Sequence, residues 1–580
     1  MSQALAKELI KRYENLRSKR VSTKDNTWQD IANFFLPQDS NVTVTKPSGD
    51  VVNWTDQIFD TTGIQAAMVF MAGDYNWTTP PQQAWAELGW PKDLGDPDDE
   101  AMNWLGKASD DLMETFARSN FYSQRALAAL GIGVFATDYL LFEEDEDEPG
   151  EFNFRHNRIG TYVLEEDHKG IVDTTMREFE MTFRQVEQKF KAEKDTIPDQ
   201  MREASKGDTG QSKKFKILHC IFPREDSDRL PQRKDAANKP IASVYLSLDY
   251  KDSIRISGYE EQPCLVPRFT KWGTDSAYGF GPAYIALPDA RELNYMAEFM
   301  DAAAEKLIDP RVLIPSLLAG DVDLRAGGQT VFDENTPKDG MPREWASGAE
   351  YKLGLEIMEQ KRNSIRDAFF VSAFKLLNSQ PLIDKKMTAY EISQRLAEQL
   401  QGFTPALARR IPEFINPLMK RAFAIRYRAG KLGQAPQSLF KQTRAGKSAL
   451  TMPEIVVTSR ISDSLKALKN TGIHQTMEFV LPISEQHPEL RLLDNFKIDD
   501  LVVEEARNNG ISAELIRPKK GADSVATLRG QAKAKNDAAQ AAAMAETLGK
   551  AGKGLGGSPA WLQDQAKEAV QGSNGNGRGR

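Results

Sequence analysis

The apolar positions near the middle of the chain predict a long helix over 286–308. Apolar side chains recur there at three- and four-residue steps, which places them on one face of a helix. Pro288 suits the first helical position, where its missing N–H costs nothing. Asp309 and Pro310 predict the end of the helix, because the residue before a proline avoids the α-helical region. The apolar stripe consists of Leu287, Ala290, Leu293, Ala297, Met300, Ala304 and Leu307.

A second and a third helical pattern follow. The segment 309–351 is irregular and contains several glycines and prolines, whereas 352–377 is again helical in pattern. After a short loop at 378–387, Thr388 and Glu391 form a capping box, in which each side chain can accept the other residue's backbone N–H. The helical run that begins there is expected to kink at its prolines rather than form one straight rod. These prolines are Pro405, Pro412 and Pro417.

The first 285 residues combine helical and strand patterns, which predicts one α+β domain. Gly131 and Gly133 are expected to turn the chain from helix into strand. Thr182 and Gln185 form a second capping box and predict a further helix. Helical patterns cover 3–36, with a polar break at 21–26, then 64–72 and 101–130. Strand patterns cover 135–141, 152–154, 162–164, 171–181, 215–222, 242–249 and 254–257. Four tryptophans indicate buried packing or a subunit contact: Trp77, Trp85, Trp90 and Trp104.

The C-terminal part changes character twice. A strand is predicted at 453–458, and scattered apolar positions over 461–522 indicate a compact helical region. From 523 to 548 the chain is rich in alanine, which favours helix strongly. Residues 549–580 are rich in Gly, Ser and Asn and are expected to be flexible.

Composition narrows the classes of protein. The 580 residues carry a net charge of −8, which argues against a generic basic nucleic-acid binder but not against a protein that DNA slides past. Two cysteines, Cys220 and Cys264, allow at most one disulfide and fit a reducing compartment. The charged N-terminus shows no signal peptide, and the longest apolar run, 126–137, is too short to cross a membrane.

No motif of enzymatic chemistry is complete. The segment 446–448 ends like a phosphate-binding loop, but Lys441 occupies the position of the required first glycine. Gly279 and Gly281 lack the third glycine of a dinucleotide fingerprint and predict a turn. The six acids at 143–148 indicate a solvated hairpin loop, although such a run could bind a cation or a basic partner. The histidines lack zinc-site spacing; they are His156, His168, His219, His474 and His487. We therefore expect a non-enzymatic protein with no catalytic residue, no metal and no cofactor.

Several short motifs occur together in a specific order. The central ones are Tyr278-Gly279-Phe280-Gly281-Pro282, Ala286-Leu287-Pro288-Asp289 and Met387-Thr388-Ala389-x-Glu391. Towards the N-terminus they are preceded by Trp28, Phe35-Leu36-Pro37, Asp60-Thr61-Thr62-Gly63, Thr79-Pro80-Pro81 and Trp85. In order and spacing the chain resembles the head-to-tail connector (portal) proteins of short-tailed double-stranded DNA bacteriophages. The resemblance covers roughly residues 5 to 460 and continues more loosely to about 520.

The resemblance implies a mainly helical α+β fold with named parts. The stem and cap positions would be Gly281, Pro282, Pro288, Thr388 and Glu391. The implied parts are a wing at 1–285, stem helices at 286–308 and 352–377 around a small clip at 309–351, and a channel loop at 378–387. Kinked helices and a strand at 388–460 would return to the wing, followed by a crown at 461–522, a barrel helix at 523–548 and a flexible tail at 549–580.

The resemblance also implies a function. The chain would form a ring, usually of twelve copies, at one capsid vertex, assembled in the host cytoplasm, through which double-stranded DNA is packaged and later ejected. Its partners would be the major capsid protein, a scaffolding protein, the terminase large subunit, a tail adaptor or tail tube protein and the DNA, with no membrane. Lys385 and Lys386 would touch DNA phosphates from the channel loop, or else form an exposed basic turn. The alternatives are a tail adaptor or internal virion protein and, from another class, the packaging motor itself.

Overall fold

The structure is a computed structural model. It describes residues 2–39, 42, 57–95, 97–191, 196–206, 213–225, 227, 229–230, 233, 235–271, 273, 276–309, 311–314, 316, 322–323, 329, 343–344, 351–378, 404–442, 448–458, 476–484, 486, 496–499, 501–503 and 525–554. The chain divides into two compact units, residues 1–473 and 474–580. Each unit is described by itself.

The N-terminal segment is helical without interruption. Helix α1 (Ser2–Arg20) continues through the π-helical turn η1 (Val21–Asp25) into α2 (Asn26–Phe35). The predicted polar break at 21–26 is therefore a π turn. The turn brings the buried Arg20 guanidinium to its Asp25 carboxylate, with Nε 3.0 Å from Oδ1, so the polar residues there form an internal ion pair.

A five-stranded antiparallel sheet forms one layer of the first unit. Its strands, in spatial order, are β4 (Tyr162–Glu166), β5 (Val172–Thr182), β6 (Lys214–Pro223), β7 (Ile241–Ser247) and β8 (Asp252–Tyr259). Apolar side chains of α1 pack on one face, and those of α6 (Phe183–Lys189) and α7 (Asp199–Ala204) pack on the other. The capping box predicted from Thr182 and Gln185 is confirmed at the start of α6.

The second layer is built from helices and a smaller sheet. Its helices are α3 (Thr62–Thr78), α4 (Asp99–Arg118) and α5 (Phe121–Phe135). Its three strands are ordered β3 (Phe152–Asn157), β2 (Tyr139–Glu144) and β9 (Cys264–Leu265). Buried side chains from these and neighbouring elements form two large hydrophobic clusters. Trp77 lies in one cluster and Trp85 in the other, and both are fully buried, as predicted.

The prediction that Gly131 and Gly133 turn the chain is wrong. Both lie inside α5, and the turn comes at Ala136, which takes a left-handed backbone conformation with φ 59°. A Cβ on Gly131 would lie 2.5 Å from Oδ1 of Asp138, and one on Gly133 would lie 2.5 Å from Cδ1 of Phe70. The two glycines therefore permit close packing around a helix that continues past them.

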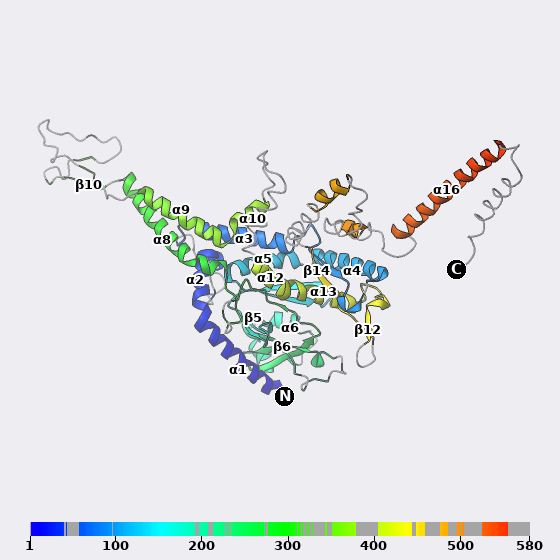
Figure 1. Cartoon of the computed structure of the whole chain (residues 1–580). Coiled ribbons are helices and arrows are strands. Elements are labelled where there is room, and N and C mark those ends of the chain that lie inside the picture. The colour runs from blue at the N-terminus through cyan, green and yellow to red at the C-terminus, as the bar shows by residue number, and fades with distance from the viewer. Residues whose placement is uncertain are drawn as a thin grey trace. The chain divides into compact units, whose positions relative to one another are not determined.

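The middle of the chain forms a long helical hairpin. Helix α8 (Pro282–Ile308) and α9 (Tyr351–Ala368) run side by side (Figure 1), and the short strands β10 (Val312–Leu313) and β11 (Arg343–Glu344) pair antiparallel between them in sequence. Figure 1 places α10 (Val371–Asn378) directly after α9. The predicted single helix over 352–377 is thus two helices.

The break between α9 and α10 has a packing reason. Phe370 takes a left-handed conformation with φ 55°, which ends α9. Phe369 and Phe374 on either side are fully buried, and both rings contact the ring of Phe70 from α3. A straight helix would not turn both rings onto the same partner, so burial of aromatic surface outweighs the strain of one residue.

The chain then packs again on the two layers of the first unit, which we call the body. Helix α12 (Thr404–Arg410), the π turn η11 (Ile411–Ile415) and α13 (Asn416–Arg428) follow without a break. The strand predicted at 453–458 is confirmed as β14 (Glu454–Val457), which pairs antiparallel with β1 (Ala86–Gly89). A small hairpin precedes it, formed by β12 (Phe440–Gln442) and β13 (Ser448–Leu450). Among the described residues, no helix has the length and hydrophobicity needed to span a bilayer.

The second unit contains one long helix. Helix α16 (Val525–Gly554) confirms the helix predicted from the alanine-rich segment, and it continues past the predicted end at 548. Most of its described side chains are exposed, and Arg529 binds the Asp499 carboxylate with both Nη atoms, at 2.7 and 2.9 Å.

Candidate functional site

The start of α8 is locked to the body by the segment 278–282. Gly279 donates its N–H to Oγ1 of Thr137 at 2.7 Å, and a Cβ at Gly279 would lie only 2.2 Å from the carbonyl oxygen of Ala136. A Cβ at Gly281 would lie 2.9 Å from the Cβ of Ala136. Both positions need glycine because the backbone approaches the α5–β2 junction too closely for a side chain.

The helix begins at Pro282, and not at Pro288 as predicted. Gly281 is fully extended, so the helix starts at the next residue, where a proline is favoured. Pro288 lies inside α8 and cannot donate to the carbonyl of Tyr284. The buried neighbours Ala286 and Leu287 lie on the body, so packing holds the helix across this missing hydrogen bond.

Polar links hold α8 and α9 together. The Asp289 carboxylate accepts from Nζ of Lys361 at 2.9 Å and from Oγ of Ser364 at 2.6 Å. Glu292 binds the same ammonium group at 2.7 Å. The Ser364 hydrogen bond and the Lys361 charge lower the pKa of Asp289. Close approach also requires Gly354, since a Cβ there would lie 2.8 Å from Sδ of Met300.

The body holds the base of the hairpin from the other side. Nε1 of Trp28 donates to the Tyr284 hydroxyl at 2.6 Å, and Arg291 binds Asp30 at 2.6 Å. The side-chain amide of Asn294 binds the segment before α3, where its oxygen accepts the N–H of Phe59 at 2.8 Å. Along α8 burial ends just beyond these contacts: within the described helix, Ala297 is the last buried residue. The hairpin is therefore fixed at its base and exposed towards its tip.

An exposed apolar stripe runs along α8. Ile285, Tyr295 and Phe299 are 58, 62 and 56% exposed, and the two rings contact each other edge-on at 4.6 Å between centroids. With the exposed Pro288 and Glu292 between them, these positions follow one another at steps of three or four residues. They therefore share one face of the helix. We call Ile285, Tyr295 and Phe299 the outer stripe. Exposed apolar surface of this kind is typical of a contact with another chain.

Buried arginines fix the return helices to the body. The fully buried Arg268 binds Glu413 of η11 at 2.6 Å and also Glu166 of β4, which in turn binds Lys271 at 2.5 Å. Burial disfavours the charged guanidinium, but the two carboxylates outweigh it and raise the pKa of Arg268. A further ion pair joins Arg426 of α13 to Asp111 at 2.5 Å.

Sequence reasoning missed these arginines. Only for the arginines of α13 was a signal available, namely a basic residue at an apolar step of the helical pattern. Arg421 and Arg426 lie among the buried Leu418, Ala422 and Ile425, where a solvated face would be unexpected. The Arg421 guanidinium donates to the carbonyl of Phe142 at 3.0 Å.

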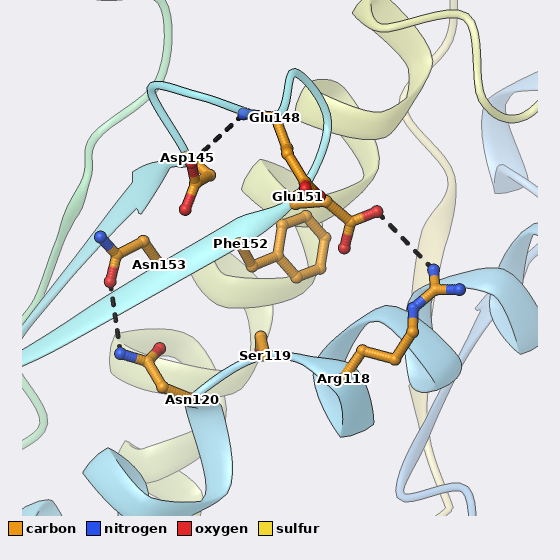
Figure 2. Close-up of a pocket in the computed structure, with 8 residues that line it drawn as sticks. All are labelled: Arg118, Ser119, Asn120, Asp145, Glu148, Glu151, Phe152 and Asn153. Carbon is orange, nitrogen blue, oxygen red and sulfur yellow. Dashed lines mark hydrogen bonds and ion pairs between the residues drawn. The ribbon is translucent and has the colours of Figure 1, made fainter.

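The acidic run at 143–148 lies at the predicted hairpin: Glu143 and Glu144 end β2, and the other four acids are in the loop that leads to β3. Within it, Oδ1 of Asp145 accepts the backbone N–H of Asp147 at 2.8 Å, and Glu144 accepts that of Gly150 at 3.0 Å. A polar cavity of about 560 Å³ lies beside the loop (Figure 2). Its lining pairs Glu151 with Arg118 at 3.7 Å and Asn120 with Asn153 at 3.2 Å. Glu144 and Asp145 thus organise the turn itself, whereas Glu143 and Glu146 bind Tyr259 and Arg255 of β8.

The other predicted positions lie apart from one another or outside the described residues. Lys385, Lys386, Thr388 and Glu391 lie outside the described residues, as does most of 446–448. His156 binds Asp138 at 2.8 Å, whereas His219 contacts Ser243 at 2.9 Å. Within the described ranges, no group of three His, Cys, Asp or Glu side chains could hold a metal ion.

Comparisons of the sequence with known proteins match nearly the whole chain. A family model described as bacteriophage head to tail connecting protein matches residues 6–516. The portal protein of Salmonella phage epsilon15 is 27% identical over 564 residues, covering 96% of each chain. The probable portal protein of Bordetella phage BPP-1 is 27% identical over 558 residues, covering 94% of this chain and 95% of the other. A chain from a structure titled as the virion of a native gene transfer agent particle aligns with a TM-score of 0.32 and 12% identity, covering 75% of this chain and 90% of that one.

Proposed function

Because the chain belongs to the family of bacteriophage head-to-tail connecting proteins and functions as a portal in a phage virion, we propose that its copies close into a ring around a DNA channel. The main support for this proposal is that the family model matches residues 6–516 of the chain. A closed ring needs two different faces on each copy that meet around the circle. The hairpin of α8 and α9 supplies a rigid, elongated element for such a contact.

Each part of the proposed ring corresponds to one of the segments that the resemblance implies. We propose that α8 and α9 form the stem, that 309–351 forms the clip that docks the terminase and later the tail, and that 378–387 forms the channel loop. The crown would comprise 461–522 and the barrel 523–548. The body before α8 would form the wing, which contacts the capsid and scaffolding proteins during assembly in the host cytoplasm. Double-stranded DNA would pass through the channel inward and leave by the same path, while ATP hydrolysis belongs to the motor.

The outer stripe supports a contact between neighbouring copies. Tyr295 and Phe299 together expose a large aromatic surface, whereas the opposite face of α8 already packs on the body. Replacing both residues with serine should leave the folded single chain unchanged, because neither is buried. The same change should abolish or weaken ring formation, measured by native mass. Glu298→Gln, an exposed change between them, serves as the control and should assemble normally.

The channel loop is tested through its two lysines. Replacing Lys385 and Lys386 with alanine should preserve the ring while reducing the amount of DNA packaged or retained. The reason is the loss of two cationic contacts to the DNA backbone, which are independent of sequence. Unchanged packaging would remove the proposed role.

The experiment that tests the function as a whole is native mass measurement with negative-stain images of the same sample. Twelve chains of 64.9 kDa should give about 779 kDa and a ring with a central hole. A monomer that hydrolyses ATP would overturn the proposal in favour of a motor. A ring of another copy number would keep the function and correct the stoichiometry.

A further inference from the structure

Two arginines share one carboxylate at the junction of α3, α5 and α12. Nη1 of Arg410 lies 2.5 Å from Oδ1 of Asp74, and Nη2 of Arg125 lies 2.6 Å from its Oδ2 and 2.8 Å from Oγ1 of Thr78. The side chains of Asp74 and Arg410 are fully buried, and that of Arg125 is 1% exposed. The group therefore contains two positive charges and one negative charge, all away from solvent.

Among the described residues, Arg125 lacks partners at Nε and Nη1, which lie on different edges of its guanidinium group, whereas Arg410 has one whole edge without a partner. Its Nε and Nη2 are buried, and within the described part of the chain neither meets an acceptor. These two atoms form the edge with which other arginines of this protein bind carboxylates. Arg20 uses Nε and Nη2 on Asp25, and Arg426 uses them on Asp111. The same edge of Arg410 therefore has the geometry to receive an anion.

The neighbouring acid does not neutralise this charge. Both oxygens of Glu413 are engaged by Arg268, and Arg409 binds one of them at 2.8 Å. The ring of Phe414 lies 5.1 Å from the Arg125 guanidinium, which gives a weak cation–π contact in place of a full counter-charge. A buried charge without a partner is costly, and buried guanidinium groups are found paired.

We propose that the Nε–Nη2 edge of Arg410 binds one small monovalent anion, such as chloride or a carboxylate as small as formate. The anion makes the group of Arg125, Asp74 and Arg410 electrically neutral. By removing the excess positive charge it stabilises the contact of Arg410 and Arg125 with Asp74, through which α12 is held on α3 and α5. The site is independent of ring formation.

The test is thermal unfolding of the full-length chain at constant ionic strength. Sodium gluconate, whose anion is too bulky for a buried site, is exchanged stepwise for sodium chloride or sodium formate. The unfolding midpoint should rise with either small anion and then level off, as expected for a ligand that binds the native state alone. No rise with chloride or formate would overturn the proposal.

Variants assign the effect to this site. Arg410→Met removes the edge and should abolish the response to the small anions. Arg410→Lys keeps the charge but not the edge, and should keep only a reduced response. Arg409→Met, at the adjacent half-buried position, is the control and should respond like the wild type. An unchanged response in Arg410→Met would place the anion elsewhere and overturn the assignment.

A direct measurement covers the case in which Arg410→Met does not fold. Crystals of the wild-type protein grown in bromide should show an anomalous scattering peak within hydrogen-bonding distance of Nε and Nη2 of Arg410. Absence of that peak in a crystal with other ordered bromide ions would reject the site.

Discussion

The α8–α9 hairpin and the α12–α13 return segment are both helical, but they are held in different ways. The hairpin is joined by partly exposed pairs such as Asp289–Lys361, and its outer stripe faces solvent. The return segment is fixed by guanidinium groups that are fully or almost fully buried, including Arg410 and Arg426. The return segment is thus fixed within one chain, whereas the hairpin leaves an exposed apolar surface, which we propose is used for contact with other chains.

The strongest way to break this comparison is Asp74→Asn. The change leaves two buried guanidinium groups without their shared carboxylate, and removing one partner of a buried ion pair typically costs about 3–5 kcal/mol. Urea unfolding should therefore show a much lower midpoint. Asp30→Asn is the matched control, because its partner Arg291 is exposed, and it should change stability by less than about 1 kcal/mol. Equal effects of the two changes would contradict the special role of the buried group.

Acid should act on the same carboxylate. Burial favours the neutral acid, but Arg410 and Arg125 outweigh it and hold the pKa of Asp74 below its usual value. The carboxylate therefore contributes stability above its unfolded pKa, and this contribution is lost as the pH falls through the lower folded pKa.

The base of the hairpin gives the next largest effect. Gly279→Ala would place a Cβ 2.2 Å from the Ala136 carbonyl oxygen, so the backbone must shift, at a cost of about 1–3 kcal/mol typical of overpacking. Gly106→Ala in α4 meets nothing within 4 Å and should instead stabilise the helix by up to about 1 kcal/mol. Opposite signs in chemical unfolding are expected. A stable Gly279→Ala variant would show that the base is not locked.

The polar links of the hairpin should matter less. Asp289→Ala removes the bonds to Lys361 and Ser364, but these groups are partly exposed, so the loss should stay below about 1 kcal/mol. The same unfolding measurement checks it. A loss as large as that of Asp74→Asn would mean that the two regions are held alike.

The smallest effect concerns the contact of His156 in β3 with Asp138, which lies between α5 and β2. Burial lowers the pKa of His156, but the Asp138 carboxylate outweighs it, so the folded pKa lies above the usual value. The contribution is therefore complete below pH about 6.5, the unfolded pKa, and is lost as the pH rises through the folded pKa. His156→Gln should flatten the stability profile in that range, whereas no change in the profile would reject the pairing.

The sequence predicted most elements but not the contacts that hold them. Apolar periodicity reports which face of a helix is buried, so α8, α9 and most of the strands were found. It does not report where close packing demands a glycine, and for that reason Gly131 and Gly133 were mistaken for a turn. The helix start was misplaced because two prolines, Pro282 and Pro288, both suit a first position, and only the extended Gly281 decides between them.

The site was less predictable than the fold. Lys385 and Lys386 were selected by resemblance and remain a prediction. Arg268 and Arg410 were missed because an arginine in a sequence does not reveal its burial. That depends on carboxylates far along the chain, such as Glu166 and Asp74.

The π turn η11 sets a rotational phase. Arg410 comes directly before it, and Arg421 and Arg426 follow in α13. A π turn holds one more residue than the corresponding α-helical stretch, and each residue advances an α-helix by about 100°. Deleting one residue from 411–415 would therefore give a regular helix that leaves α13 in its present phase, whereas winding all five residues as α-helix would rotate α13 by about that angle. In the second case Arg410 would keep its partner while Arg421 and Arg426 swung away from theirs, so the wide turn, by taking up the extra residue, keeps both sets of arginines facing their partners.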